Sequence, residues 1–332
     1  MGAEGFERVA STAETQRKYR EAGAVLAQRW CGLDGMLNPA LVCAAFAGKA
    51  KGKVYSVATL RLYRQQVLAY VRTLDPDPAT VQAVEMLHLH RYASDEVKTA
   101  GRKMQSVKAK DAQVLLAFLK RSDGTDMGRI AGDFFEAGLM FGLRPVEWVN
   151  AQLDVCEPGT AGDAITRDGD PEPTHKLQVV NAKANNVRGN GHGRVIYAFL
   201  NVEQAEVVLR VIAWARENAL VWPGAYKRLA NALYYGGHAL WPRRSRVPCF
   251  YTARHQCIAN AKAAGGEPNE LAAMFGHASD WTARKHYSRA TNGDKNKYMI
   301  RASRISLREV RNQTLTVAVR EAQVSPVQAT KK

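Results

Sequence analysis

A short basic stretch near the end of the chain, FGHASDWTARKHYSR (275–289), places a histidine, His277, ten positions before a tyrosine, Tyr287. A tyrosine hydroxyl has an ordinary pKa near 10, so it reacts as a nucleophile at neutral pH only with a positive field and a proton acceptor. Three cations lie in the same stretch: Arg284, Lys285 and Arg289. By itself the stretch is equally compatible with an ordinary surface helix. The assignment therefore depends on which residues elsewhere in the chain reach this tyrosine.

The distribution of charge indicates a polyanionic partner. The formal net charge is +16, and the stretches 35–74, 173–202 and 218–266 contain cations but no aspartate or glutamate. A surface that only needs solubility mixes both signs, whereas neutralising a phosphate backbone favours cations alone. A solvated basic surface is the alternative interpretation. The candidate DNA-binding residues are Lys49, Lys51, Lys53, Arg61, Arg64, Lys103, Arg188, Arg243 and Arg244.

Other features of the composition exclude several classes of protein. The five cysteines are scattered and form no CxxC pair, which favours reduced thiols over disulfides or a zinc site. No apolar run approaches the length of a membrane span, and the first twenty residues lack the apolar core of a signal peptide. We therefore expect a cytoplasmic, nucleoid-associated protein with no membrane partner.

Four segments of the chain, in this order, resemble the motifs of the tyrosine site-specific recombinases, the family that includes phage integrases. They are GLMFGLRPVEW with Arg144, the hairpin LQVVNAKANNVRGNGHGRVI with Lys183, FYTARHQ with Arg254, and the opening stretch with His277 and Tyr287. Each motif alone is weak. Their order and the 23-residue step from Arg254 to His277 make the combination specific. The resemblance covers residues 105 to 290.

The resemblance implies DNA cleavage and rejoining through a 3′-phosphotyrosine, without metal, ATP or another cofactor. Tyr287 would attack phosphorus, and the planar guanidinium groups of Arg144 and Arg254 would hold the phosphate oxygens bidentately. Lys183 would protonate the departing 5′ oxygen, and His277 would hydrogen-bond the phosphate. Because these cations stabilise the charge on phosphorus, no metal ion is expected.

One departure from the family pattern concerns Tyr251, which stands three residues before Arg254, where the family has a histidine. A phenol can donate a hydrogen bond to a phosphate but is a poor base near neutrality. Either Tyr251 is a neutral donor in the catalytic set, or His255 or His286 takes over the role of base.

The spacing between His277 and Tyr287 is one residue longer than the family pattern, so Tyr298 remains a second candidate nucleophile. Glu147, one turn after Arg144, is expected to form a salt bridge that orients this arginine. Two aromatic groups are expected in the core rather than on a base-stacking surface: Trp222 with Trp241, and Tyr234 with Tyr235.

The elements that position these residues are predicted to be mainly helices with a small antiparallel β-sheet. Residues 1–104 would form a helical DNA core-binding domain, with one helix beginning after the cap Ser56, and residues 105–300 an α+β catalytic domain. Short β-rich runs between 149 and 200 predict the sheet. Residues 301–332 would be a C-terminal tail that contacts a neighbouring protomer, because the 45 residues after Tyr287 include apolar residues without an evident partner, among them Ile300, Ile305 and Leu307.

The expected partners are double-stranded DNA with inverted half-sites, a homotetramer assembled on two such sites, and accessory DNA-binding proteins. The expected role is integration, excision, transposition or resolution of a mobile element or replicon. One alternative with the same chemistry is a hairpin-telomere resolvase or a type IB topoisomerase-like enzyme. An alternative of another class is a catalytically inactive DNA-binding protein on a recombinase fold.

Overall fold

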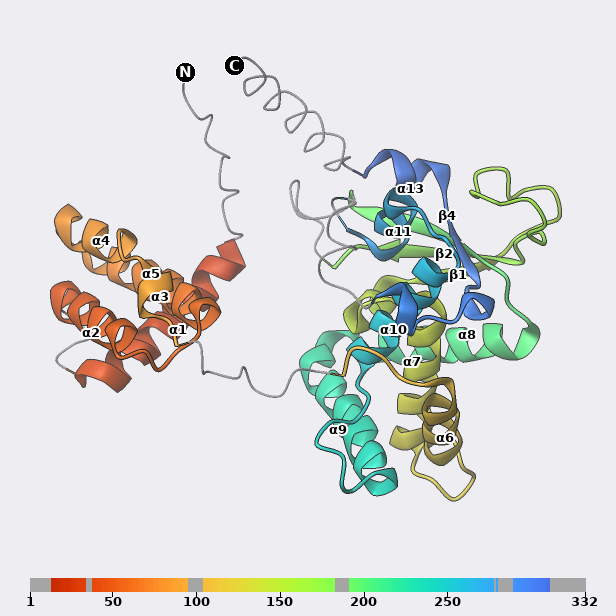
Figure 1. Cartoon of the computed structure of the whole chain (residues 1–332), viewed down its shortest axis with the longest axis horizontal. Helices are drawn as coiled ribbons and strands as arrows, with labels where there is room; N and C mark the ends of the chain where they lie inside the picture. The colour runs from red at the N-terminus through yellow and green to blue at the C-terminus, as the bar shows by residue number, and fades with distance from the viewer. Residues whose placement is uncertain are drawn as a thin grey trace, which may run out of the picture. The chain divides into compact units, whose positions relative to one another are not determined.

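The computed structural model describes residues 13–33, 38–94, 104–182, 191–277, 279 and 289–310. The chain divides into two compact units, Met1–Arg102 and Lys103–Lys332 (Figure 1). The predicted fold class is confirmed, because the described chain is mainly helical with one small antiparallel sheet.

The first unit is all helical. Its elements are α1 (Ala13–Cys31), α2 (Pro39–Lys51), α3 (Val57–Val71), the 3-10 turn η2 (Arg72–Leu74), α4 (Pro78–Glu85) and α5 (Leu89–Tyr92). The predicted cap is present, since Ser56 Oγ accepts a hydrogen bond from Thr59 N at 3.2 Å. A core that includes Phe46, Leu60 and Val67 joins the helices. A side chain at Gly23 would collide with the backbone of α3, so α1 and α3 pack in close contact.

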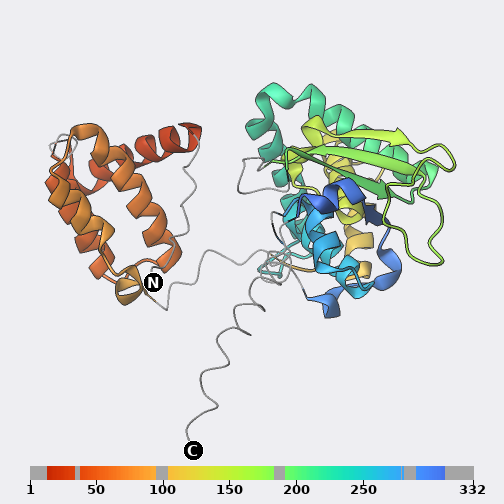
Figure 2. The ribbon, with the colours of Figure 1, turned by 90° about the horizontal axis from the view of Figure 1, so that it is seen from above.

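The second unit combines helices with the sheet. Its elements are α6 (Ala109–Leu119), α7 (Asp126–Phe141), η3 (Pro145–Asn150), β1 (Gln152–Val155), β2 (His175–Val180), β3 (Gly193–Ala198), α8 (Val202–Glu217), η4 (Ala219–Val221), α9 (Trp222–Leu240), α10 (Phe250–Ala263), α11 (Pro268–Phe275), η5 (Ala290–Asn292), η6 (Lys295–Lys297), β4 (Ile300–Ala302) and α13 (Arg304–Arg308). The strands pair antiparallel in the order β1-β2-β3-β4, and Figure 2 shows them as one layer.

Helix α10 lies at the centre of the second unit. Ten of its side chains are buried, including Phe250, Arg254 and Ile258, and it packs against α7 on one side. The core continues through Phe141 and Trp148, whose rings meet edge to face at a centroid distance of 6.0 Å. Because α10 is enclosed on most sides, the polar residues that it carries must find partners inside the protein.

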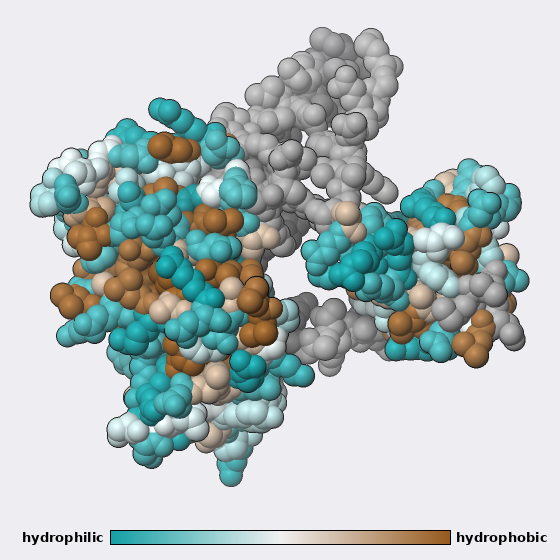
Figure 3. Space-filling view, turned by 180° about the vertical axis from the view of Figure 1, so that it is seen from behind, coloured by the Kyte–Doolittle hydropathy of each residue, from teal (hydrophilic) through white to brown (hydrophobic). Residues whose placement is uncertain are grey.

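The surface of the second unit carries hydrophobic residues in small groups among hydrophilic ones on the face seen in Figure 3. Among the helices that the structure describes, none is both long and apolar enough to cross a lipid bilayer.

The start of the predicted tail belongs to the second unit, so the boundary expected at residue 300 is wrong. Ile300 is fully buried in β4, which pairs with β3, and Leu307 packs against the core, whereas Ile305 is 63 % exposed. Arg301 forms a bidentate ion pair with Asp170 at 2.6 and 2.7 Å. The sequence missed β4 because three residues are too short for a period-two pattern to be recognised. Residues 311–332 of the predicted tail lie outside the described part.

We expect a chain that ends at Ile300 to lose more than about 3 kcal/mol of unfolding free energy, since breaking one buried ion pair alone costs that much. The cut also removes Ala302 and Ser303, which have no exposed surface. A chain that ends at Val310 keeps these contacts and should unfold within a few degrees of the full chain. Thermal denaturation measures both. Equal stability of the two shortened chains would show that β4 contributes nothing.

Candidate functional site

Arg144 is positioned by the end of helix α7. The helix terminates at Gly142, whose φ of +61° is left-handed and whose N–H donates to Gly138 O at 2.9 Å. A Cβ at this position would lie 2.7 Å from the ring of Phe275. Both the conformation and the close packing therefore require glycine. The turn buries Leu143 and directs the chain into Arg144, which is only partly buried.

The carboxylate of Glu147 gathers the arginines of the site. It accepts hydrogen bonds from Arg144 Nη1 at 2.6 Å and from Arg194 Nη2 at 2.9 Å, and Arg254 Nη1 lies 4.0 Å away. It also accepts from the backbone N–H groups of Arg144 and Ala182 at 2.8 and 3.3 Å. The predicted salt bridge with Arg144 is present, but the same carboxylate serves two further arginines.

The ionisation of Glu147 follows from these contacts. Burial by itself raises the pKa of the carboxyl group, but Arg194, Arg254 and Arg144 together hold that pKa well below its usual range. The carboxyl group is therefore ionised at neutral pH. A fixed negative charge with no exposed surface stands at the centre of the site.

Arg194 is a site residue that the sequence analysis did not select. It has no exposed side-chain surface, and beyond Glu147 it donates to Met274 O at 2.7 Å and to Asn181 Oδ1. Its position on β3 could have indicated its burial, because every second residue of the strand (Arg194, Ile196 and Ala198) lies on the side that faces the core. An arginine in register with core residues needs a buried counterion.

Arg254 is fully buried on α10. It donates to Gly142 O, to Phe275 O at 2.7 Å and to His277 Nε2 at 3.1 Å. Gly142 O and Phe275 O belong to the C-terminal ends of α7 and α11, where helix carbonyls lack intrahelical partners and carry partial negative charge. Arg254 was expected to hold phosphate oxygens, but its guanidinium group bonds to these carbonyls and to the histidine, and its side chain is almost completely buried.

His277 follows the left-handed C-cap of α11. Gly276 has φ +61°, and a Cβ there would lie 2.7 Å from both Arg194 Nη1 and Asn181 Oδ1, so the Gly-His pair requires its glycine. Burial lowers the pKa of His277 well below its ordinary value, and the neighbouring arginines lower it further. A guanidinium group can only donate, so His277 Nε2 accepts from Arg254 and the neutral ring carries its proton on Nδ1.

Lys183 and Tyr287 lie outside the described residues. The residue before Lys183, Ala182, donates its N–H to Glu147 Oε1, so the hairpin enters its loop at the arginine cluster. Asn181 closes the other side of this loop by donating to Gly191 O at 3.2 Å. Tyr287 lies between two described points of the second unit, His277 and Arg289.

The two other tyrosines that the sequence raised are described. Tyr251 is half-buried in the first turn of α10, one turn before Arg254 and on the same side of the helix. Tyr298 donates its hydroxyl proton to Glu270 Oε1 at 3.2 Å, and burial together with Glu270 raises its pKa well above 10. This environment disfavours the phenolate of Tyr298, so Tyr298 is a poor candidate nucleophile.

The predicted DNA-binding cations differ in their surroundings. Lys49, Lys51 and Lys53 are exposed at the end of α2, and Arg61 is exposed beside His90, with 2.7 Å between Arg61 Nη2 and His90 Nε2. Arg64 donates to the backbone carbonyls of Glu85 and Leu87. Lys103 and Arg188 lie outside the described residues.

Around the end of α9 the surface is basic and aromatic. Arg243 is exposed, whereas Arg244 pairs with Asp111 at 2.8 Å and lies over the Trp241 ring. The expectation that Tyr234 and Tyr235 lie in the core is wrong, because they are 52 % and 66 % exposed. Trp222 does pack against the core, as expected.

In the described part of the chain, we find no group of three or more His, Cys, Asp or Glu side chains that could hold a metal ion.

Solved structures that are similar to this chain include two recombinases. One is the XerA recombinase, at 12 % identity and a TM-score of 0.34, covering 84 % of this chain and 89 % of that one. The other is the XerH site-specific recombinase bound to its difH substrate in a pre-cleavage complex, at 14 % identity and a TM-score of 0.37, covering 85 % and 83 %. No family model and no curated protein matches the chain.

An alanine in a left-handed conformation costs about 1–2 kcal/mol. We expect Gly276→Ala to lower the unfolding free energy by more than this, because its Cβ would also displace Arg194 or Asn181. Gly159→Ala is the matched control, since Gly159 has φ +77° and no atom within 4 Å of its Cβ position. Urea denaturation measures the two costs. Equal losses would contradict the packing described around Gly276.

His277 is expected to stay neutral, with its proton on Nδ1, as the pH falls from 8 to 6, which nitrogen-15 NMR of labelled histidine reports. An unfolded histidine binds a proton below about pH 6.5, whereas the folded pKa lies lower. Relative to His277→Gln, the protein should therefore lose stability below pH 6.5, by up to about 1.4 kcal/mol per pH unit. Titration of His277 near 6.5 would contradict this environment.

Proposed function

We propose that this protein is a site-specific DNA recombinase that cuts and rejoins DNA through a 3′-phosphotyrosine formed by Tyr287. The observation that carries the proposal is the cluster of Arg144, Arg194 and Arg254 around one buried carboxylate, Glu147. Three guanidinium groups held around a single counterion leave an excess of positive charge. Such a centre favours binding of a phosphodiester and stabilises the charge of its transition state.

Arg144 is the arginine that would contact the phosphate directly. Its Nη1 and backbone N–H bond to Glu147, while its Nε and Nη2 have no partner in the part of the chain that the structure describes. The side chain is 12 % exposed, against 1 % for Arg254. One edge of its guanidinium fork is therefore available to two phosphate oxygens. Arg254 would add positive field and hold His277.

The proton steps fall to other residues. In the proposed reaction, Tyr287 Oη gives its proton to a base, for which His255 and His286 are the candidates, and bonds to phosphorus while the bond from phosphorus to the 5′ oxygen breaks. Lys183 would protonate the 5′ oxygen, and Tyr251 would donate a hydrogen bond to a phosphate oxygen. His277 is a poor base here, because its Nε2 is occupied by Arg254 and its pKa is depressed. The cleavage needs no metal, ATP or other cofactor.

The proposed partner is double-stranded DNA with inverted half-sites, bound by four protomers on two duplexes. The exposed lysines at the end of α2 and the surface around Arg243, Tyr234 and Tyr235 are suited to contact DNA, because cations bind phosphates and aromatic rings contact sugars and bases. Residues 311–332 would supply the contact between protomers. Integration, excision and resolution of a mobile element are the roles that fit this chemistry.

A second candidate function is DNA binding without catalysis. It is favoured by the complete burial of Arg254, whose donors bond to carbonyl groups, and by Tyr251 in the place of a histidine base. Under this alternative the arginine cluster is purely structural. One covalent-trapping experiment separates the two functions.

Wild-type protein incubated with a pool of nicked duplexes of randomised sequence is expected to form a protein–DNA adduct that survives denaturant. The nick releases the short 5′-hydroxyl strand after cleavage, so the adduct accumulates. Tyr287→Phe should bind the same DNA but form no adduct, because only the attacking oxygen is lost. Tyr298→Phe is the matched control and should form the adduct at the wild-type rate. Gel electrophoresis in denaturant measures the adducts.

Four outcomes would contradict the proposal or part of it. No adduct from the wild-type protein supports binding without catalysis. An adduct from Tyr287→Phe that is absent from Tyr298→Phe moves the nucleophile to Tyr298. Loss of the wild-type adduct in a chelator of divalent cations contradicts the metal-free reaction. Relaxation of plasmids that contain none of the captured sequences indicates a topoisomerase instead.

A further inference from the structure

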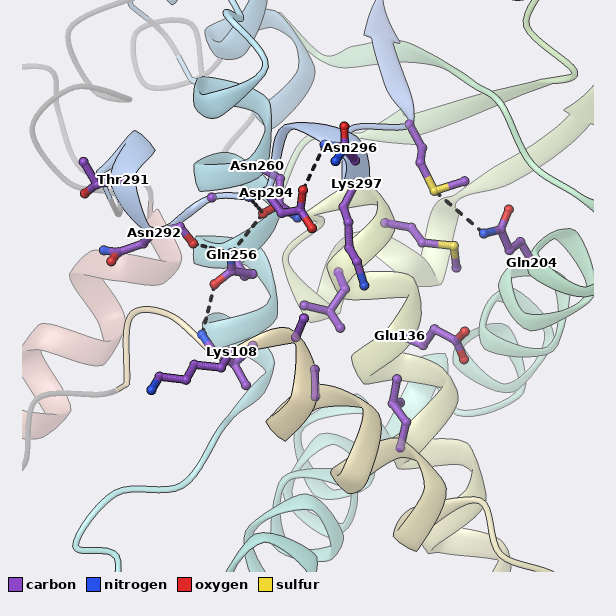
Figure 4. A pocket seen from close by; sticks show the side chains of 18 residues that line it. Lys108, Glu136, Gln204, Gln256, Asn260, Thr291, Asn292, Asp294, Asn296 and Lys297 are labelled. Carbon is purple, nitrogen blue, oxygen red and sulfur yellow. Dashed lines mark hydrogen bonds between the residues drawn. The ribbon is translucent and has the colours of Figure 1, made fainter.

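Helix α10 carries three polar residues, Thr252, Gln256 and Asn260, at intervals of four along one side. All three are buried, with at most 7 % of their surface exposed. Gln256 and Asn260 line a cavity of about 490 Å³ between α6, α7 and residues 291–299 (Figure 4). The chemistry proposed above uses none of them, and buried polar groups have a cost unless they are hydrogen-bonded.

Two of these residues hold the chain where it enters the second unit. Thr252 Oγ1 donates to Met104 O at 2.7 Å, and Gln256 Oε1 accepts from Val107 N at 3.0 Å. These bonds fix residues 104–107 against α10 immediately before α6 begins. The first described residues of the second unit are therefore attached to the helix that carries Arg254.

The same side of α10 also holds the segment that follows Tyr287. Gln256 Nε2 donates to Asn292 O at 2.7 Å and to Asn260 Oδ1 at 2.9 Å, and Asn260 Oδ1 accepts from Asp294 N at 3.0 Å. Figure 4 shows these side chains converging, with the bonds dashed. Between them, Gly293 approaches α10 so closely that a Cβ there would lie 2.1 Å from Ala259 O.

We propose that Gln256 is a positioning residue for Tyr287, because its single amide group ties the entry of the chain into the second unit to the segment that follows the tyrosine. The inference rests on the proposed function. Asn292 follows Tyr287 by five residues, and Gln256 follows Arg254 by two on the same helix. The amide thus links the segment that follows Tyr287 to the helix that carries Arg254.

The chemistry of the amide explains why glutamine is suited to this role. Val107 N offers a donor and Asn292 O offers an acceptor, so the residue between them must accept on one side and donate on the other. A carboxylate can only accept. Misplacing a nucleophile by about 1 Å can cost on the order of a hundredfold in rate, so the loss of one side should be measurable.

The test is Gln256→Glu, which keeps the acceptor for Val107 N and removes the donor to Asn292 O. The substrate is the nicked duplex that wild-type protein captures from the randomised pool. At saturating DNA and pH 8 we expect adduct formation to be slower by about tenfold or more, with DNA affinity unchanged. As the pH falls towards 5, the buried carboxyl group protonates and can donate again, so the ratio of variant to wild-type rate should rise.

Gln204→Glu is the matched control. Gln204 lines the same cavity, and its Oε1 accepts from Asn201 N at 3.0 Å, a role that glutamate also fills. It has no bond to residues 292–294, and its Nε2 contacts Met299 Sδ instead. This variant brings the same charge into the same cavity and should cleave within twofold of wild type. Asn260→Asp should also be near normal, because its acceptor oxygen remains.

Hydrogen exchange measured without DNA gives a readout that does not depend on activity. In Gln256→Glu the amide of Asp294 should exchange faster than in wild type, whereas in Gln204→Glu it should be unchanged. If wild-type protein forms no adduct, the proposed function fails, and the exchange data still report on the anchor. If Gln256→Glu unfolds, Gln256→Met at lower temperature replaces it, with the same expected loss but no recovery at low pH.

Three results would overturn the inference. The first is a cleavage rate of Gln256→Glu within twofold of wild type at every pH. The second is an equal loss in Gln204→Glu, which would assign the effect to charge in the cavity. The third is unchanged exchange at Asp294 in Gln256→Glu, which would show that the amide does not hold the segment.

Discussion

The organisation of the second unit depends on one buried negative charge. Glu147 has no exposed side-chain surface and lies within 4.0 Å of three arginines, which come from the residue before η3, from β3 and from α10. Without the carboxylate, three buried or half-buried guanidinium groups would repel one another in a medium of low dielectric constant. With it, residues of the helical part and of the sheet share one buried counterion. Removing one of these charges would leave its partners buried without a counterion, which is strongly destabilising.

Two glycines at helix C-termini beside Glu147 also shape the surroundings of the arginines. Gly142 and Gly276 both adopt left-handed conformations. The carbonyl group of Gly142 accepts a hydrogen bond from Arg254, and the backbone at Gly276 lies close against Arg194. The arginines thus meet two kinds of negative charge: a full one on Glu147 and partial ones on the helix termini. This pairing explains why two short sequence motifs, GLR and GH, each combine a glycine with a polar residue.

Local periodicity and short spacing were enough to predict most of the helices, three of the four strands, the cap at Ser56 and the salt bridge between Glu147 and Arg144. It did not allow Arg194 to be selected, since its partner Glu147 is 47 residues away and only the folded sheet brings them together. The burial of Arg254 was missed for a similar reason. Its carbonyl partners are backbone atoms, which carry no mark in the sequence. The exposure of Tyr234 and Tyr235 depends on which side of α9 faces the core.

The close approach of Gly293 to α10 has a consequence for the geometry of an assembly. Residues 289–294 return to the same helix that holds His277 through Arg254, so described residues on both sides of Tyr287 are fixed to one helix of one polypeptide. Two residues separate Tyr287 from Arg289, a span of at most about 7 Å. If the protein cleaves DNA as proposed, these attachments favour attack by each tyrosine on the phosphate bound by the arginines of its own chain. A neighbouring protomer would then regulate the reaction by acting on residues 278–288 rather than by donating the nucleophile.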